Sequence, residues 1–140
     1  ATLILGLTSD NTGLVPTADV KILRTFGEEI KKRFDHPLAE TNGTGYSFLI
    51  QLKNAQTINQ VSIQEDISRG ERIRKYKVEA LINGKWELLC EGSSVGNKRI
   101  QMFKEITAKK IRLTIAESIA QPQIYSFKIY NVHFDNTVRN

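Results

Sequence analysis

The segment from 65 to 72, EDISRGER, opens with two adjacent carboxylates and also carries two arginines. Such groups could hydrogen-bond the hydroxyls of a sugar or carry out acid–base chemistry. Hydrolysis of a glycoside needs two carboxyl groups about 5–10 Å apart on either side of the substrate. Glu65 and Asp66 are neighbours, so an extended chain points them to opposite sides. The segment therefore predicts a polar loop and no catalytic pair.

The candidate carbohydrate-binding residues are charged side chains of this loop and a basic pair further along the chain. They are Glu65, Asp66, Arg69, Arg72, Lys98 and Arg99. A structural interpretation stands beside the binding one, because Arg72 could pair with Glu65 or Asp66 and fix the shape of the loop. The residues alone do not decide between the two interpretations.

Sugar binding also needs an aromatic face, and Trp86 is the natural candidate. Trp86 falls on the same alternation as Leu88 and Cys90, which favours a packed tryptophan on the hairpin. The tyrosines are expected to be half-buried aromatic residues of strands: Tyr46, Tyr76, Tyr125 and Tyr130. Asn42-Gly43-Thr44 matches an N-glycosylation acceptor, which has meaning only in a eukaryotic source.

Catalysis by other routes has no support in the sequence. Cys90 is the single cysteine, so no internal disulfide can form, and its apolar surroundings predict a buried, inert thiol. His36 and His133 are not spaced as a metal pair, and no Cys/His cluster accompanies them. The chain shows no nucleophile motif and no phosphate-binding glycine loop. We expect no catalytic residue, no cofactor and no metal site in this chain.

The net charge is +5, from 20 Lys and Arg against 15 Asp and Glu. A basic chain suggests nucleic acid as a partner, but these basic residues are scattered instead of forming one patch. The apolar runs are too short to cross a membrane, and no signal peptide is visible. We therefore expect neither a nucleic-acid nor a membrane partner. The beginning of the chain at Ala1, inside a strand-like run, is typical of a piece of a longer protein.

The first 37 residues predict a strand, a turn-rich loop and a helix. Leu3 to Leu7 form a short apolar run, followed by the turn residues TSDNTG. Thr17 is suited to cap a helix from 18 to 33, and Asp19 adds an acid to its first turn. One apolar stripe runs along this helix, through Val20, Leu23, Phe26, Ile30 and Phe34. The segment DHPLAETNGTG, from 35 to 45, then predicts a linker.

From Tyr46 onward the hydrophobic period changes to two. The expected strands are 46–52, 58–64, 73–82, 85–90, 99–103, 110–116 and 123–134. Asn83-Gly84 supplies the tight turn of a hairpin. Short strands separated by turn residues, with no helix between them, predict a mainly β fold, an antiparallel jelly-roll sandwich preceded by one amphipathic helix. The expected units are residues 1–37 and 38–140.

Two stretches carry a family resemblance. LILGLTSDNTGLVPTADVKILRTFGEEIKKRF, from 3 to 34, resembles the end of the catalytic barrel in family 29 α-L-fucosidases, with Ser9 in place of the usual proline. VSIQEDISRGERIRKYKVEALINGKWELLCEGSSVGNKRI, from 61 to 100, is similar to the discoidin-like (F5/8 type C, galactose-binding-like) β-sandwich that follows that barrel. KKIRLTIAES and PQIYSFKIY continue the second match toward the C-terminus.

The resemblance implies an accessory, non-catalytic C-terminal domain of an α-L-fucosidase, a hydrolase that removes terminal fucose and whose catalytic carboxylates lie in the upstream barrel. The partners it implies are that upstream catalytic domain and galactose- or fucose-type glycans, and the implied location is secreted or periplasmic. Related family 32 carbohydrate-binding modules begin with an Asp-Gly…Thr-x-Trp stretch that holds calcium. Residues 36 to 47 lack it, so a structural calcium is not expected.

Two alternatives remain open. The chain could be an independent carbohydrate-binding module, which should show an exposed aromatic residue beside Arg69 and Arg72. It could also be a discoidin-type adhesion or lipid-surface domain, which needs apolar residues at its loop tips, and ISRGERI and EGSSVGNKR contain few. The apolar helix should fold back or form a homodimer through residues 18–34 in the isolated chain, because monomers rarely expose such a patch.

Overall fold

The computed structural model describes residues 4–133 of the 140-residue chain. The chain divides after His36 into two compact units. The first contains one helix, α1 (Thr17–Phe34), and the second contains all six strands. The strands are β1 (Ala39–Thr44), β2 (Ser47–Glu65), β3 (Ile73–Ile82), β4 (Lys85–Gly92), β5 (Arg99–Ser118) and β6 (Gln123–Tyr130), and a short 3₁₀ helix, η1 (Ile67–Arg69), follows β2.

The helix is confirmed, while two details of the first unit differ from the prediction. Pro16 occupies the N-cap position and no side chain caps the helix, so Thr17 begins α1 instead of capping it. Residues 4–7 are extended but form no strand, and Leu3 lies outside the described residues. A strand needs a hydrogen-bonded partner strand, and the described part of this unit offers only a helix. The predicted turn is present, with Asp10 Oδ1 accepting hydrogen bonds from the backbone N–H groups of Thr12 (2.8 Å) and Leu14 (3.1 Å).

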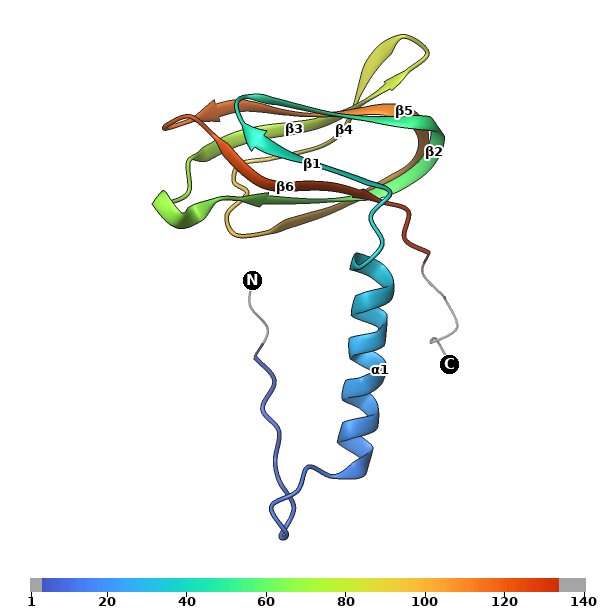
Figure 1. The fold of residues 1–140 in the computed structure, drawn as a ribbon, viewed down its shortest axis with the longest axis vertical. Coiled ribbons are helices and arrows are strands. Elements are labelled where there is room, and N and C mark those ends of the chain that lie inside the picture. Colours follow the sequence, from blue (N-terminus) through green and yellow to red (C-terminus); the bar gives the residue numbers. More distant parts are fainter. Residues whose placement is uncertain (1–3, 134–140) are drawn as a thin grey trace. The chain divides into compact units, whose positions relative to one another are not determined.

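The second unit is the predicted mainly antiparallel β-sandwich, built from a single folded sheet. The strand order is β1-β6-β2-β5-β3-β4. The first part of β2 pairs with the last part of β5, as at Phe48 with Leu113, and the last part of β2 pairs with the first part of β5, as at Val61 with Gln101. Both strands curve together in Figure 1 and so pass from one layer to the other.

This continuity corrects the predicted strand count. The strands predicted at 46–52 and 58–64 are the two arms of β2, and those at 99–103 and 110–116 are the two arms of β5. The register shifts between Gln51 and Gln56 and again between Ile58 and Gln60, where bulges allow the bend. The polar residues at the bend resemble a turn in sequence. Tertiary pairing nevertheless keeps them in the sheet.

The ends of the sandwich differ from the prediction as well. Residues 39–44 were expected to be a linker but form β1, which pairs with β6 from Ala39 opposite Ile129 to Thr44 opposite Gln123. A polar segment of this kind becomes a strand only because β6 offers it an edge. The last strand was predicted to reach Phe134 but ends at Tyr130, and Phe134 lies outside the described residues.

The core lies between the two layers. It consists of aliphatic and aromatic side chains from both, among them Phe48, Ile50, Ile58, Ile63, Tyr76, Val78, Leu113, Phe127 and Ile129. Cys90 packs against this core, where burial raises its pKa to about 12 although Arg99 opposes the shift. The thiol is therefore protonated and unreactive at neutral pH, as predicted. Tyr76 and Tyr130 are fully buried, not half-buried.

A β-bulge in β4 overturns the predicted orientation of Trp86. The β3–β4 hairpin turns at Asn83 and Gly84, both with positive φ as expected, but its register shifts between Val78 and Glu79. Because of this shift Leu88 lies opposite Glu79, whereas Cys90 lies opposite Val78. Trp86 and Leu88 therefore share the outer face of the sheet, and only Cys90 of the three faces the core.

A charged network occupies this outer face. Glu79 is 7% exposed and accepts hydrogen bonds from Lys77 Nζ and Arg112 Nη2, each at 2.9 Å. The Arg112 guanidinium also lies 4.1 Å from the centre of the Trp86 ring. Burial raises the pKa of Glu79, but the hydrogen bonds from Lys77 and Arg112 outweigh it and leave the pKa below its usual value. Arg112 thus compensates a buried charge and covers an aromatic ring.

Arg112→Ala should lower the free energy of unfolding by about 1–3 kcal/mol at pH 7, because it leaves the buried Glu79 carboxylate with one partner fewer. Lys109→Ala, at an exposed position of the same strand, is the control and should change stability little. Since the folded pKa of Glu79 is lowered, its stabilisation is present above the range where a free glutamate titrates and is lost as the pH falls through the lowered pKa. Urea unfolding at pH 7 and pH 3 measures both effects. An equal loss at the two pH values would contradict this account.

Candidate functional site

Four connections meet at one end of the sandwich, on the left in Figure 1. The η1 loop hydrogen-bonds the β4–β5 loop through Glu65 N–H to Gly96 O (3.1 Å), and the β5–β6 loop through Asp66 N–H to Gln123 O (2.9 Å). The β1–β2 turn joins the same group through Gly45 N–H to Pro122 O (3.0 Å). The predicted charged loop therefore lies at the centre of a loop cluster and not at an isolated tip.

Glu65 holds the η1 loop closed. It is 3% exposed, and its Oε1 accepts hydrogen bonds from the backbone N–H groups of Arg72 (2.6 Å) and Ile73 (3.2 Å). A carboxylate that accepts two backbone hydrogen bonds bridges the two ends of the loop more strongly than a neutral acceptor would. Its second oxygen, Oε2, is also buried and has no hydrogen-bond partner. Gly70, with φ of +86°, supplies the left-handed residue that ends η1 within this closed loop.

Arg72 braces a neighbouring loop. Its Nη1 donates a hydrogen bond to Gln121 O (2.8 Å), and its carbonyl accepts one from Ile119 N–H (2.9 Å). The connection between Arg72 and Glu65 runs through the backbone N–H of Arg72. The guanidinium, which was expected to pair across the loop neck, fixes the β5–β6 loop that leads to Gln123 and Tyr125.

The remaining predicted residues lie around the loops that Glu65 and Arg72 hold in place. Asp66 is partly exposed and accepts a hydrogen bond from Ser68 N–H (3.0 Å), and its pKa is lowered chiefly by this bond and then by the Ser68 side chain. Arg69 is exposed at the end of η1. Lys98 and Arg99 are exposed where the β4–β5 loop enters β5. The structure thus brings the two predicted groups to the same end of the sandwich, on adjacent loops.

Two hollows adjoin Asp66 and Tyr125. The first, of about 350 Å³, is lined by both residues and by Asn42, Gly43, Thr44, Gln123 and Ile124. The second, of about 200 Å³, is lined by both residues and by Gln64, Glu65, Ile67, Ser68 and Asn97. Of the predicted site residues, only Glu65 and Asp66 line these hollows. Polar side chains and one exposed aromatic ring converge here, so the hollows can offer both hydrogen bonds and a ring face to a small polar molecule.

Tyr125 is the important residue that the sequence-based prediction missed. It is 70% exposed, while its neighbours Ile124 and Ser126 are buried. The register with β2 shifts between Gln64 and Glu65, and these residues pair with Ser126 and Ile124, so Tyr125 is left out of the ladder. Ile124 and Phe127 both belong to the core although they are three positions apart. An odd spacing between core residues indicates a bulge, and this signal could have identified Tyr125.

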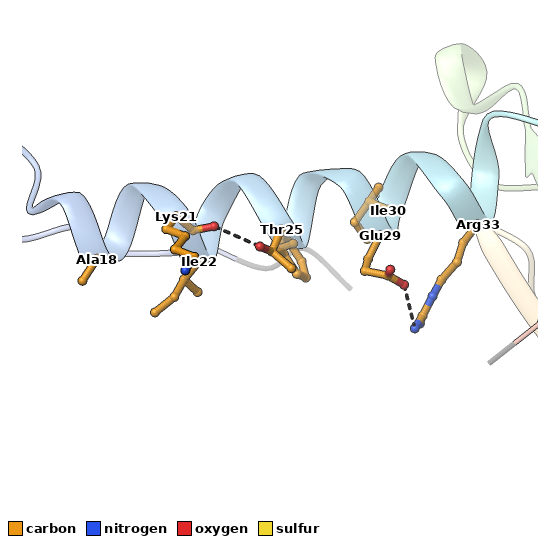
Figure 2. Close-up of a pocket in the computed structure, with 8 residues that line it drawn as sticks. Ala18, Lys21, Ile22, Thr25, Glu29, Ile30 and Arg33 are labelled. Atoms are coloured by element: carbon orange, nitrogen blue, oxygen red, sulfur yellow. Dashed lines mark hydrogen bonds and ion pairs between the residues drawn. The ribbon is translucent and has the colours of Figure 1, made fainter. Parts of the chain in front are cut away.

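A second exposed surface lies on α1 (Figure 2). No described residue of this helix is buried, and Ile22, Phe26 and Ile30 follow one another at intervals of four. Ala18, Lys21, Thr25, Glu29 and Arg33 lie along the same face. Glu29 forms an ion pair with Arg33 at 3.6 Å. Ile22 is 66% exposed, Phe26 46% and Ile30 43%, so this apolar stripe is only partly covered by the described residues of its unit. We name Ile22, Phe26 and Ile30 the helix stripe.

Comparison with known proteins identifies the family of this sandwich. The family model of the F5/8 type C domain matches residues 28–127. The chain belongs to the F5/8 type C domain family. The matched range contains the whole loop cluster and all of β2 through β5, so the predicted discoidin-like sandwich is confirmed.

The relatives of this F5/8 type C domain are α-L-fucosidases, as the resemblance implied. A crystal structure of a Bacteroides thetaiotaomicron protein assigned as an α-L-fucosidase shares 49% identity, with a TM-score of 0.92 over 95% of this chain and 31% of that one. A family 29 fucosidase of Ruminococcus gnavus, solved with fucose, shares 27% identity, with a TM-score of 0.77 over 95% of this chain and 34% of that one.

A plant relative is also a fucosidase. Alpha-L-fucosidase 1 of Arabidopsis thaliana is 22% identical over 98% of this chain and 34% of its own length. The chain spans about a third of the length of the curated relatives that it matches.

Between residues 4 and 133, no three His, Cys, Asp or Glu side chains lie close enough together to hold a metal ion. No helix in the same range is long and apolar enough to cross a membrane.

Glu65→Ala should loosen the η1 loop, because it leaves two backbone N–H groups at the loop neck without an acceptor. We expect a loss of about 1.5–3 kcal/mol in the free energy of unfolding and faster amide exchange over residues 66–73. Glu65→Gln keeps an acceptor oxygen and is the matched control, with a smaller loss. Urea unfolding and hydrogen exchange measure both variants. Unchanged exchange at Arg72 and Ile73 in Glu65→Ala would show that the carboxylate does not hold the loop.

Proposed function

We propose that this F5/8 type C domain is the non-catalytic accessory C-terminal part of an α-L-fucosidase-like glycoside hydrolase. In this role it braces the upstream catalytic domain and contacts glycans through its loop cluster. The observation that carries the proposal is the partly exposed helix stripe, together with relatives that are fucosidases about three times as long. We assign the parent protein to the secreted or periplasmic space, where glycan substrates occur.

The helix stripe supports the bracing role because large parts of its side chains stay exposed within their own unit. Burying an isoleucine or phenylalanine side chain fully is worth about 1.5–3 kcal/mol. A partner surface that covers Ile22, Phe26 and Ile30 would therefore gain several kcal/mol. We assign residues 1–37 to the edge of the catalytic barrel and residues 38–140 to the sandwich. The stripe then belongs to the interior of the parent enzyme.

The loop cluster supports the glycan contact. An exposed tyrosine ring offers an apolar face to the C–H groups of a sugar, and amide and carboxylate groups beside it can bind hydroxyls. Tyr125, Asp66, Asn42 and Gln123 have this composition around the first hollow. An independent carbohydrate-binding module was expected to show an exposed aromatic residue beside Arg69 and Arg72. Tyr125 lies beside Asp66 instead, and neither arginine lines a hollow. The glycans that this site fits are the galactose- and fucose-type sugars of the predicted partners.

The bracing role can be tested by grafting this chain onto the 49% identical Bacteroides protein in place of its matching third. The graft should fold, hydrolyse p-nitrophenyl α-L-fucoside and unfold within a few degrees of the parent protein. Ile22→Asp or Ile30→Asp in the graft should lower the melting temperature by about 5 °C or more, because a charge enters a buried apolar contact. Arg24→Asp, which changes a residue outside the stripe, is the matched control. Equal melting temperatures for all three variants would contradict the proposal.

The isolated chain should self-associate through residues 18–34, since the helix stripe then lacks its partner. Light scattering should show a dimer at micromolar to millimolar concentration, and Ile30→Asp should shift it to the monomer. A monomer at all concentrations, with rapid amide exchange from 18 to 33, would rule out both dimerisation and folding back of the helix.

A further inference from the structure

The two hollows of the loop cluster share two residues. Asp66 and Tyr125 line both, and each hollow adds polar residues of its own. We propose that this site takes a glycan of at least two uncharged sugar residues, one in each hollow, with Tyr125 between them. The proposal rests on the glycan contact proposed above and extends it from a single sugar to a linked pair.

The sizes of the hollows support a linked pair. Sites for small organic ligands usually measure about 300–1,000 Å³. The first hollow, at about 350 Å³, is at the lower end of this range, and the second, at about 200 Å³, is below it. Neither is a full site for an oligosaccharide by itself. Because Asp66 and Tyr125 belong to both, a ligand that fills one hollow is already in contact with the wall of the other.

Tyr125 is suited to lie between two rings. With 70% of its surface exposed and its position outside the β2 ladder, its ring is not held by core contacts. A tyrosine contributes a large contact area and loses little conformational entropy on binding, since only two side-chain angles become fixed. The hydroxyl of the same ring can bind a bridging oxygen or a hydroxyl of either sugar.

Both hollows present polar side chains that can bind the hydroxyls of a sugar. The first presents the amides of Asn42 and Gln123 and the hydroxyl of Thr44, which both donate and accept. The second presents the amides of Gln64 and Asn97 and the hydroxyl of Ser68, beside the buried Glu65. Asp66 lines both hollows and can accept a hydrogen bond from a hydroxyl of a sugar in either one.

The charge of the linings selects uncharged sugars. None of the described residues that line either hollow is a lysine or arginine, whereas Asp66 lines both. Asp66 stays ionised at neutral pH, because its hydrogen bonds with Ser68 lower its pKa. Arg69 and Arg72 also lower this pKa, but neither lines a hollow, so a sialic acid or uronic acid in either hollow would face this carboxylate without a lining cation to pair with. The glycan should therefore be neutral in both positions.

The experiment is a titration of the full 140-residue chain, followed by amide chemical shifts. The ligands are fucose, galactose, N-acetyllactosamine, a fucosylated neutral trisaccharide and 3′-sialyllactose. The neutral oligosaccharides should bind about tenfold more tightly than either monosaccharide, as expected when a second ring adds one or two hydrogen bonds. Their shifts should include amides of both hollows, near Asn42 and Gln123 and near Ser68 and Asn97.

Variants separate the two positions. Asn97→Ala, in the second hollow, should reduce the affinity for the oligosaccharides several-fold and leave the monosaccharide affinity unchanged. Tyr125→Ala should abolish the gain of the oligosaccharides over the monosaccharides. Tyr46→Ala removes another exposed tyrosine that lines neither hollow and is the matched control. Circular dichroism and amide spectra of each variant confirm that it is folded.

The outcomes also separate this inference from the proposed function. Equal affinity for monosaccharides and oligosaccharides, with shifts in one hollow, would overturn the two-sugar inference and keep the glycan contact. Tight binding of 3′-sialyllactose would overturn the neutral requirement. Absence of shifts with all five sugars at millimolar concentration would overturn the glycan contact and this inference together, while the bracing role would still be decided by the grafted enzyme.

Discussion

The pairing of β2 with β5 is the constraint on which the rest of this domain depends. The two strands stay paired from Ser47 opposite Thr114 to Ile63 opposite Arg99, across a bend that carries both into the second layer. β3 can add only to β5 in one layer, and β6 only to β2 in the other. The ends of these strands then fix where the connecting loops emerge. A loop cluster at one end of the sandwich follows from one long pairing, and most of these contacts join residues far apart in sequence.

Bulges decide which side chains of this frame face water. A single extra residue reverses the side of every residue beyond it. The bulge in β4 moves Trp86 and Leu88 to the outer face, where Arg112 and the buried Glu79 complete a charged network. The irregularity in β6 releases Tyr125 from the ladder beside the η1 loop. A bulge therefore gives a structural charge network on β4 and an exposed aromatic ring on β6.

The sequence predicts much of the fold because local patterns and tertiary pairing agree there. The helix at 17–34, the Asn83-Gly84 hairpin and the alternation of Ile111, Leu113 and Ile115 were all predicted correctly. The predictions failed where the outcome depends on a distant partner. Residues 39–44 became a strand through β6, which lies about eighty to ninety positions further on, and the bends of β2 and β5 resemble turns until their pairing is known. The six predicted site residues lie on adjacent loops at one end of the sandwich, while the exposure of Tyr125 depends on a bulge that simple alternation does not reveal.

Burial separates the roles of the charged side chains in the η1 loop. A carboxylate that accepts two backbone hydrogen bonds in the interior, as Glu65 does, is too constrained to follow a ligand and instead sets the shape of its loop. The guanidinium of Arg72 is held in the same way by the carbonyl of Gln121. Asp66, whose side chain remains partly exposed, is free to contact a ligand from this rigid frame. Binding residues work best when their neighbours are fixed beforehand, since less conformational entropy is then lost on association. Charged residues that look alike in sequence thus serve as frame or as contact according to what the fold covers.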